Sequence, residues 1–267
     1  MPFPELDLDG RVALVTGAGR GIAGGVARIL AEAGADVALN ARTKQYAGPL
    51  AAEIARATGR RIEVFPADMT DPASVESTVA AVLASFGQID VLVNGVGDAI
   101  ASPLVPLPGA AERAEPGGAL TVEDLDLTLS LNLTAALLSS RAVGPHMLER
   151  GSGVVVSIGS FAGLRGGAGT TIYAAGKSGL VGFTRALALE WAPYGVRVNA
   201  VAPGSFPDPV TSGDDGYRRA VEGARTRVPL GRVGELREAG LLVAYLASPA
   251  AAYITGQTLA IDGGSTL

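Results

Sequence analysis

A tyrosine and a lysine four positions apart form the pattern in this chain that is best suited to chemistry. Tyr173 and Lys177 are predicted to share one helix face, because residues i and i+4 are neighbours there. A nearby ammonium group favours the phenolate and lowers the pKa of a tyrosine. Such a phenol can exchange protons with a carbonyl or alcohol oxygen. Ser160 precedes the tyrosine by thirteen positions, and Ser157 is a second serine near the end of the same predicted strand.

A glycine-rich turn near the amino terminus connects a predicted strand at 11–15 to a predicted helix at 20–33. Strand, glycine turn and helix in this order predict a dinucleotide site. The glycines let the backbone approach a pyrophosphate, which lies at the positive end of the helix. The alternative is a tight turn that binds no ligand. The turn residues predicted to contact the cofactor are Gly17, Gly19, Arg20, Gly21 and Ile22.

Apolar strand-like runs alternate with helix-like segments along the whole chain. The predicted strands are 11–15, 36–41, 62–66, 89–93, 153–158, 196–201 and 258–261. The predicted helices are 20–33, 46–58, 72–86, 122–149, 174–192 and 235–247. This alternation predicts an α/β fold, a Rossmann-type doubly wound parallel sheet of about seven strands with helices on both faces. No linker-like break divides the chain, so we expect one domain over residues 1–267.

The end of the second predicted strand bears on the choice of coenzyme. In the NAD-binding arrangement an acidic residue there accepts hydrogen bonds from the ribose 2′-hydroxyl. Here the position holds Ala41, and Arg42 follows it, while Arg20 lies in the glycine turn. Two guanidinium groups without an opposing carboxylate suit a 2′-phosphate. The sequence therefore favours NADP(H) over NAD(H), unless both arginines are only solvated surface charges.

Composition excludes several classes of protein. The chain has no cysteine and one histidine, His146, which we expect to be a surface residue near the end of a helix. Thiolate nucleophiles and cysteine metal sites are therefore excluded, and a histidine-dependent hydrolase or a catalytic metal is not expected. The net charge of −5 argues against a nucleic-acid partner. No apolar run reaches the ~18 residues of a membrane span, and no signal peptide is evident, so we expect a cytoplasmic enzyme.

The order of its motifs makes the chain resemble the compact members of the short-chain dehydrogenase/reductase family over residues 8–264. The matching motifs are Thr16-Gly17-x-x-x-Gly21, Asp68, Asn94-Gly95-x-Gly97, Asn132, Ser160, Tyr173-x-x-x-Lys177, Val198 to Gly204, Ile254 to Gln257 and Asp262-Gly263-Gly264. Each motif is modest on its own, but the order and spacing of the set are specific to the family. They are not specific for a substrate.

The resemblance implies roles for individual residues. Tyr173 would donate a proton to a carbonyl oxygen or remove one from an alcohol. Lys177 would bind the nicotinamide ribose, Ser160 would hold the substrate oxygen, and Asn132 would hold a water molecule that relays protons to the lysine. The implied cofactor contacts beyond the glycine turn are Arg42, Asp68, Met69, Asn94, Gly95, Tyr173, Lys177, Pro203, Gly204 and Ser205. For Asp68 the alternative is a turn or helix cap, although Asp71 is the better candidate for the cap.

The chain departs from the family pattern in three places. Ala23 stands where the third glycine of the turn is usual, which puts cofactor affinity in doubt, and Gly95 replaces a second asparagine. Residues 99–120 form a Pro- and Gly-rich insertion that either walls the substrate pocket or extends into solvent. The resemblance makes 205–230 the substrate lid. Its residues free to contact substrate are Phe206, Val210, Tyr217, Arg218 and Arg219, although the arginines also suit a solvated helix face.

The expected activity is hydride transfer between NADP and a carbonyl/secondary alcohol pair of a small molecule. A 3-oxoacyl thioester or related ketone is the first substrate class, and a sugar or polyol is the alternative. A catalytically silent dinucleotide-binding regulator is the alternative of another class. The segments 122–149 and 174–192 are apolar on more than one side, so each needs a second burial partner. The matching helices of the family meet symmetry mates, which implies a homotetramer here.

Overall fold

The computed structural model describes residues 3–98, 100–108 and 118–267. Its strands form one parallel sheet in the order β3-β2-β1-β4-β5-β6-β7. The strands are β1 (Val12–Val15), β2 (Asp36–Ala41), β3 (Ile62–Pro66), β4 (Val91–Asn94), β5 (Gly153–Ile158), β6 (Val196–Pro203) and β7 (Thr258–Ile261). The strands are added outward from β1 in one direction as far as β3, and from β4 onward they are added on the other side of β1, so the strand order reverses between β1 and β4. Ligands of such sheets bind beyond the carboxyl ends of the strands at that reversal.

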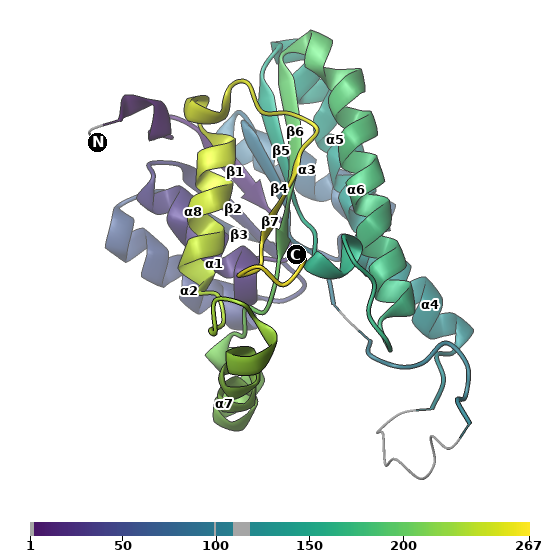
Figure 1. Cartoon of the computed structure of the whole chain (residues 1–267). Coiled ribbons are helices and arrows are strands. Elements are labelled where there is room, and N and C mark those ends of the chain that lie inside the picture. Colours follow the sequence, from purple (N-terminus) through teal and green to yellow (C-terminus); the bar gives the residue numbers. More distant parts are fainter. Residues whose placement is uncertain (1–2, 99, 109–117) are drawn as a thin grey trace.

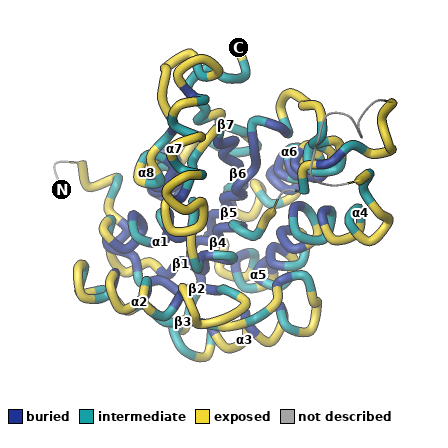
Figure 2. The backbone as a smooth tube through the Cα atoms, turned by 90° about the horizontal axis from the view of Figure 1, so that it is seen from below, coloured by how far each residue is buried: buried dark blue, intermediate teal, exposed yellow. Residues whose placement is uncertain are grey.

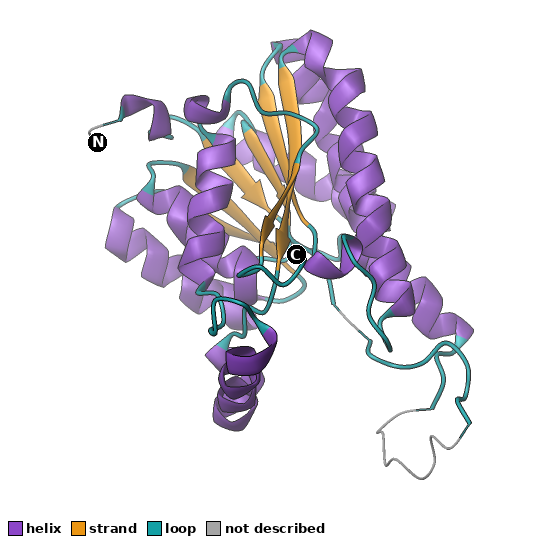
Figure 3. Cartoon of the chain, viewed as in Figure 1, coloured by secondary structure: helices purple, strands orange, loops and turns teal. Residues whose placement is uncertain are grey.

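Helices cover both faces of the sheet (Figures 1 and 3). They are α1 (Gly21–Glu32), α2 (Lys44–Thr58), α3 (Pro72–Phe86), α4 (Val122–Leu129), α5 (Ala135–Arg150), α6 (Thr171–Trp191), α7 (Pro209–Arg227) and α8 (Leu236–Ala247). Helices α1, α2 and α8 lie on one face, and α3, α5 and α6 lie on the other. None of the helices in the described part of the chain combines the length and apolarity that a bilayer span needs.

The sheet is buried on both faces, which explains why its strands read as continuous apolar runs. One apolar cluster joins the sheet to α1 and α8 through residues such as Leu30 and Val243. A second cluster joins the other face to α3 and α5 through Val82 and Met147. Figure 2 shows this buried centre between exposed outer helix surfaces. The two layers hold the strand ends in fixed positions, so the loops that follow the strands meet at one edge.

Most predicted elements lie where the sequence places them. The strands 36–41, 62–66, 153–158 and 258–261 and the helix 72–86 have the predicted bounds. The predicted helix over 122–149 is helical throughout, from Val122 to Arg150, but it is not one regular α-helix. A π-helical turn at Ser130–Thr134 separates α4 from α5. A π turn widens the hydrogen-bonding pattern by one residue, and such turns occur frequently at functional sites.

The lid segment contains a helix that the sequence did not predict. Helix α7 spans Pro209–Arg227 and bends at Gly213, whose φ is 63°. This left-handed conformation suits glycine and interrupts the helical pattern. The three polar residues around this glycine favour a flexible loop on local composition alone. The helix forms nevertheless, because Asp208 caps its first turn by accepting a hydrogen bond from the backbone nitrogen of Val210 at 2.9 Å.

His146 is not the simple surface residue that the sequence predicted. Its ring is partly buried in α5, and its Nε2 accepts a hydrogen bond from the backbone nitrogen of Ile89 at 3.2 Å. Burial, followed by the charge of Arg150, lowers the pKa of this imidazole below its ordinary value. The ring therefore joins α5 to the start of β4 and lies outside the chemistry described below.

Candidate active site

Two adjoining clefts lie at the carboxyl edge of the sheet, where the strand order reverses. They share Gly17, Arg20, Gly95, Gly97 and Asp98, and we call them together the active-site groove. The predicted residues that line the first cleft are Gly17, Gly19, Arg20, Arg42, Asp68, Met69 and Gly95. Those that line the second are Gly17, Arg20, Gly21, Ile22, Gly95, Ser160, Tyr173, Lys177, Pro203 and Gly204. The fold thus brings most of the predicted cofactor and catalytic residues to one place.

The glycines of the groove let the turn after β1 and the loop after β4 pack closely against each other. Gly17 has φ 66°, and a Cβ built on it would lie 2.9 Å from the backbone nitrogen of Val96. A Cβ on Gly95 would lie 2.5 Å from the carbonyl oxygen of Thr16. Helix α1 begins at Gly21, so its positive end faces the same groove. A glycine turn that leads into a helix N-terminus fits the pyrophosphate of a dinucleotide.

The outer end of the first cleft carries positive charge. Arg20 and Arg42 both line it, and the Arg20 guanidinium lies 5.7 Å from the ring centroid of Tyr46. The side chain of Asp68 accepts hydrogen bonds from the nitrogen and the hydroxyl of Thr70, at 2.8 and 2.7 Å. These bonds, and then the charge of Arg42, lower the pKa of this carboxyl below its ordinary value. The end of the cleft therefore fits an adenosine that carries a 2′-phosphate.

The side chains of this cleft that the sequence did not predict include Thr43, Gln45 and Tyr46, which line it together with Arg42. The signal for them was their position directly after β2, since side chains that follow a strand of a parallel sheet gather at its carboxyl edge.

Asp71 caps α3, as expected, by accepting a hydrogen bond from the backbone nitrogen of Ser74 at 2.8 Å.

Tyr173, Lys177 and Ser160 meet in the second cleft. The Lys177 ammonium donates to the carbonyl oxygen of Ile158 at 2.9 Å and lies 5.8 Å from the ring centroid of Tyr173. Ser160 lies in the short loop directly after β5, and its hydroxyl shares a hydrogen bond with the Tyr173 phenol. A Cβ on Gly163 would lie 2.8 Å from the backbone of Lys177. This glycine therefore lets the turn after Ser160 pack closely against α6, which carries both other residues.

The expectation that Lys177 lowers the pKa of Tyr173 is not met in this structure. Burial raises the pKa of the Tyr173 phenol above its ordinary value, the hydrogen bond with Ser160 lowers it in part, and the charge of Asp98 raises it further. Burial also lowers the pKa of Lys177 to about 8. The ammonium points to the carbonyl of Ile158, so desolvation of the phenol is the larger effect.

Asn132 lies behind the cleft, in the π-helical turn. Its Nδ2 donates to the carbonyl oxygens of Asp98 at 2.6 Å and of Thr128 at 2.9 Å. Its Oδ1 is buried and has no hydrogen-bond partner in the described part of the chain. A Cβ on Gly97 would lie 2.9 Å from this oxygen and 2.9 Å from the Lys177 ammonium. The acceptor and the ammonium thus approach the same glycine, an arrangement that suits a bridging water molecule.

Three serine and asparagine side chains lie away from the groove. The Nδ2 of Asn94 donates to Ser140 and Ser157, at 3.1 and 3.2 Å, so Asn94 joins β4 to α5 and β5 and does not line the groove with its side chain. Ser157 is fully buried in this network, whereas Ser160 lines the cleft. Ser205, predicted as a cofactor contact, lines a separate pocket beside Phe206 and Asp262.

The lid residues that line the groove differ from most of those that the sequence predicted. Phe206 lines the second cleft, together with Asp208, Thr211 and Ser212, which the sequence reasoning had not named. Val210, Tyr217, Arg218 and Arg219 do not line it. The Arg218 side chain is 75% exposed and pairs with Asp215 at 2.6 Å. These arginines therefore lie on a solvated helix face, the interpretation that the sequence favours over a substrate contact.

The insertion is described only in part, since residues 99 and 109–117 lie outside the described residues. Ser102 donates from its nitrogen to the carbonyl of Gly169 at 2.9 Å, and Leu120 donates in the same way to Pro103 at 3.0 Å. None of the described residues 100–108 and 118–120 lines the groove. Leu104, Val105 and Leu107 are about half exposed (48–58%).

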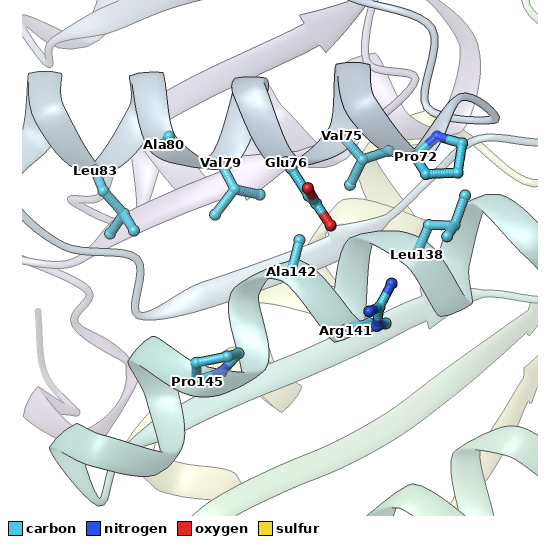
Figure 4. Close-up of a pocket in the computed structure, with 10 residues that line it drawn as sticks. All are labelled: Pro72, Val75, Glu76, Val79, Ala80, Leu83, Leu138, Arg141, Ala142 and Pro145. Atoms are coloured by element: carbon cyan, nitrogen blue, oxygen red, sulfur yellow. The ribbon is translucent and has the colours of Figure 1, made fainter.

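A further surface groove lies between α3 and α5, away from the strand ends (Figure 4). Its walls are mostly apolar, with Val75, Val79 and Leu83 from α3 and Leu138 from α5. Glu76 and Arg141 are the charged residues that line it. None of the predicted catalytic residues Asn132, Ser160, Tyr173 and Lys177 lines it, so the groove at the strand ends is the candidate active site.

Comparisons with known proteins agree with this geometry. The family model described as enoyl-(acyl carrier protein) reductase matches residues 17–266. The chain is 36% identical to the 3-oxoacyl-[acyl-carrier-protein] reductase FabG of Vibrio cholerae serotype O1 over 259 residues, 97% of this chain and 98% of the relative. It is 38% identical to the D-threitol dehydrogenase of Mycolicibacterium smegmatis over 268 residues, 98% of this chain and 95% of the relative.

Solved structures share the fold over the whole chain. The gluconate 5-dehydrogenase of Burkholderia cenocepacia J2315, in complex with NADP and tartrate, is 32% identical. It covers 100% of this chain and 99% of its own, with a TM-score of 0.85. The motifs, the sheet order and these relatives lead to one conclusion: the chain belongs to the short-chain dehydrogenase/reductase family and is an NAD(P)-dependent oxidoreductase.

Proposed function

We propose that this enzyme reduces a ketone to a secondary alcohol with NADPH, and that a 3-oxoacyl thioester is its substrate class. The observation that carries the proposal is the meeting of Tyr173, Ser160 and Lys177 in a cleft that continues into the glycine-lined cofactor site. The FabG relatives, which are named as 3-oxoacyl reductases, support the substrate class. The whole chain would act as one domain built on the single sheet, with insertion 99–120 and lid 205–230.

The dinucleotide would extend through both clefts, with a different group of residues contacting each of its parts. Arg20 and Arg42 would bind the 2′-phosphate, since the short Ala41 side chain between them carries no competing charge. Asp68 and Met69 would lie at the adenine, and the glycine turn with Ile22 would hold the pyrophosphate. Pro203 and Gly204 would lie at the nicotinamide. NADPH, when bound, supplies the hydride for the reduction.

The protein's own residues would manage the proton and the orientation of the substrate. Ser160 would donate a hydrogen bond to the substrate oxygen and fix its position beside Tyr173. Tyr173 would give its phenolic proton to that oxygen during reduction and take it back during oxidation. Lys177 has ammonium donors beyond the one that Ile158 accepts, and these can bind ribose hydroxyls. The free acceptor of Asn132 would hold the water molecule that returns a proton toward Lys177.

A sugar or polyol dehydrogenase is the second candidate. Asp98, Thr211 and Ser212 line the substrate side of the groove, and all three can bond hydroxyl groups. The arginines Arg218 and Arg219, two of the lid residues expected to be free to contact substrate, do not line it. The D-threitol dehydrogenase relative is consistent with this reading. The silent regulator is disfavoured, because the relatives compared above are all named as enzymes.

A substrate panel tests these alternatives. Initial rates would be measured with a 3-oxoacyl thioester, a small neutral ketone, D-threitol and gluconate, each with the appropriate form of NADP and NAD. Fastest turnover of the thioester with NADPH is the expected result. Faster oxidation of D-threitol or gluconate would replace the reductase with the second candidate. A protein that binds NADPH but turns over no member of the panel would contradict the proposal.

A further inference from the structure

One carboxylate of the lid is bound to the start of the cofactor helix. Oδ2 of Asp208 accepts a hydrogen bond from the backbone nitrogen of Gly21, the first residue of α1, at 2.8 Å. Oδ1 of the same carboxylate accepts from the nitrogen of Val210 at 2.9 Å and caps α7. Asp208 is 8% exposed and lines the groove. A single anion thus joins the N-terminal ends of two helices that are far apart in the sequence.

The position of this carboxylate coincides with the proposed pyrophosphate site. The first backbone N–H groups of a helix and its positive end attract anions, and a dinucleotide places its pyrophosphate there. In this structure Asp208 already uses the Gly21 donor. A pyrophosphate and a carboxylate at the same point would compete for one N–H group and would repel each other.

We propose that Asp208 is a latch that competes with the coenzyme: the pyrophosphate of the dinucleotide displaces its carboxylate from Gly21, and this release frees the start of α7. The inference rests on the proposed function, because it assumes a dinucleotide in the groove. The hydrogen bond of Asp208 to Gly21 would weaken coenzyme binding, and coenzyme binding would in turn change the position of the lid. Asp208 would therefore affect coenzyme affinity although it does not contact the bound coenzyme.

The lid is built so that this contact can control it. Pro207 and Pro209 flank Asp208, and each fixes its own φ, so a shift of the carboxylate also moves the start of the helix. Gly213, whose φ is 63°, interrupts the helix after its first turn and can absorb the change in backbone angles. Of the residues of α7, which the structure describes in full, only Ala224 is buried. A helix with so little buried surface separates from the protein at low cost.

The latch also lies next to the substrate side of the groove. Thr211 and Ser212, in the first turn of α7, line the same cleft as Tyr173 and Ser160. Release of Asp208 would therefore change the wall of the substrate site only after the coenzyme has entered. The expected consequence is an ordered reaction in which the coenzyme binds first.

Asp208→Asn tests the competition directly. Asparagine keeps the helix cap and nearly the same shape, but it removes the charge. Dissociation constants for NADP⁺ and for 2′-AMP, which has no pyrophosphate, would be measured by isothermal titration calorimetry. The variant should bind NADP⁺ about tenfold more tightly, the scale of one hydrogen bond to a charged group. Its affinity for 2′-AMP should change by less than about twofold, because that ligand does not reach Gly21.

A control on the same helix separates this effect from general charge. Asp214→Asn removes one negative charge from an exposed position of α7 that does not line the groove. It should leave both dissociation constants within about twofold of the wild type. Equal or weaker NADP⁺ binding by Asp208→Asn would overturn the latch, and so would an equal gain from Asp214→Asn. Asp208→Ser, which also caps a helix without charge, replaces the asparagine variant if that protein does not fold.

Hydrogen–deuterium exchange provides the second measurement. Saturating NADP⁺ should speed the exchange of the wild-type segment 209–216, because its anchor is released, and Asp208→Asn should exchange faster there without any ligand. Unchanged exchange in both cases would contradict the release of the lid. If neither protein binds NADP⁺, the proposed function fails and the latch fails with it. If both bind NADP⁺ equally well, only the latch fails.

Discussion

The methyl group of Ala23 lies against Gly95: a Cβ built on that glycine would come within 2.7 Å of the Ala23 Cβ. Both residues depart from the family pattern, and the structure shows that they depart together. The alanine occupies space beside the start of α1 that a side chain at position 95 would otherwise need. The glycine after β4 therefore makes room for the alanine at the start of α1.

This contact predicts a coupled pair of substitutions. Gly95→Ala should lower the free energy of unfolding by about 1–3 kcal/mol, because the new methyl meets both Ala23 and the Thr16 carbonyl. Adding Ala23→Gly should recover part of that loss, with a coupling energy of about 1 kcal/mol. Urea unfolding of the wild type, both single variants and the double variant measures it. Gly48→Ala, where a Cβ meets nothing within 4 Å, is the control, and an equal loss there would contradict the prediction.

Removal of the Tyr173 hydroxyl should stop proton transfer and leave the cofactor site intact. Tyr173→Phe should lower kcat by about 10²–10⁴-fold, the range of a general acid, with less than a threefold change in the NADPH dissociation constant. Steady-state kinetics and NADPH fluorescence titration give the two quantities. Tyr253→Phe changes a fully exposed tyrosine and should behave as wild type. Retention of most activity by Tyr173→Phe would remove the tyrosine from its assigned role.

The buried ammonium of Lys177 predicts a pH-dependent stability. Burial lowers its pKa to about 8 in the folded protein, from 10.5 in the unfolded chain. Below pH 8 both states hold the proton, and the cost of burying the charge is fully present. Between about pH 8 and 10.5 the folded state loses the proton first, so the free energy of unfolding should rise with pH, by up to about 3 kcal/mol.

Other groups titrate in the same range, so the comparison needs a matched variant. The rise should be absent from Lys177→Met and present in Lys44→Met, which changes the chain's other, exposed lysine. Denaturant unfolding at half-unit steps between pH 7 and 10 measures the difference. Parallel curves for the wild type and Lys177→Met would show that the ammonium is not desolvated as the structure indicates.

The end of β2 predicts the coenzyme preference. Ala41→Asp combined with Arg42→Ile should shift the ratio of kcat/KM for NADPH and NADH toward NADH by at least tenfold. The new carboxylate accepts from a ribose 2′-hydroxyl and repels a 2′-phosphate. Arg56→Ile, on the exposed side of α2, is the control and should keep the wild-type ratio. A wild type that already prefers NADH would contradict the assignment of Arg20 and Arg42.

Exposed leucines on three helices predict the assembly. Leu127 on α4, Leu137 on α5 and Leu189 on α6 are 51%, 37% and 79% exposed, and an apolar residue so placed favours a second burial partner. We expect a homotetramer, with a mass near four times the 26.8 kDa of the chain in light scattering. Leu189→Asp should reduce that mass, and Val210→Asp on the lid should not. A wild-type mass near 26.8 kDa would contradict both the tetramer and a dimer.

Much of the fold follows from local pattern. Buried parallel strands need apolar runs, so β2, β3, β5 and β7 could be bounded from residue type alone, and the glycine turn with the Tyr173–Lys177 spacing located both halves of the groove. These features depend on neighbours within a few residues along the chain. The same is true of the helix cap at Asp71, whose carboxylate accepts a hydrogen bond from the backbone nitrogen of Ser74, three residues further along the chain.

The remaining features depend on contacts between distant segments. The direction of the Tyr173 pKa shift is set mainly by burial, which only the packed protein determines. The π-helical turn places Asn132 against the loop after β4, and local periodicity carries no trace of that contact. The sequence pattern assigns no role to Asp208. Folding brings it to Gly21, 187 positions away, and this long-range hydrogen bond connects the lid to the start of α1.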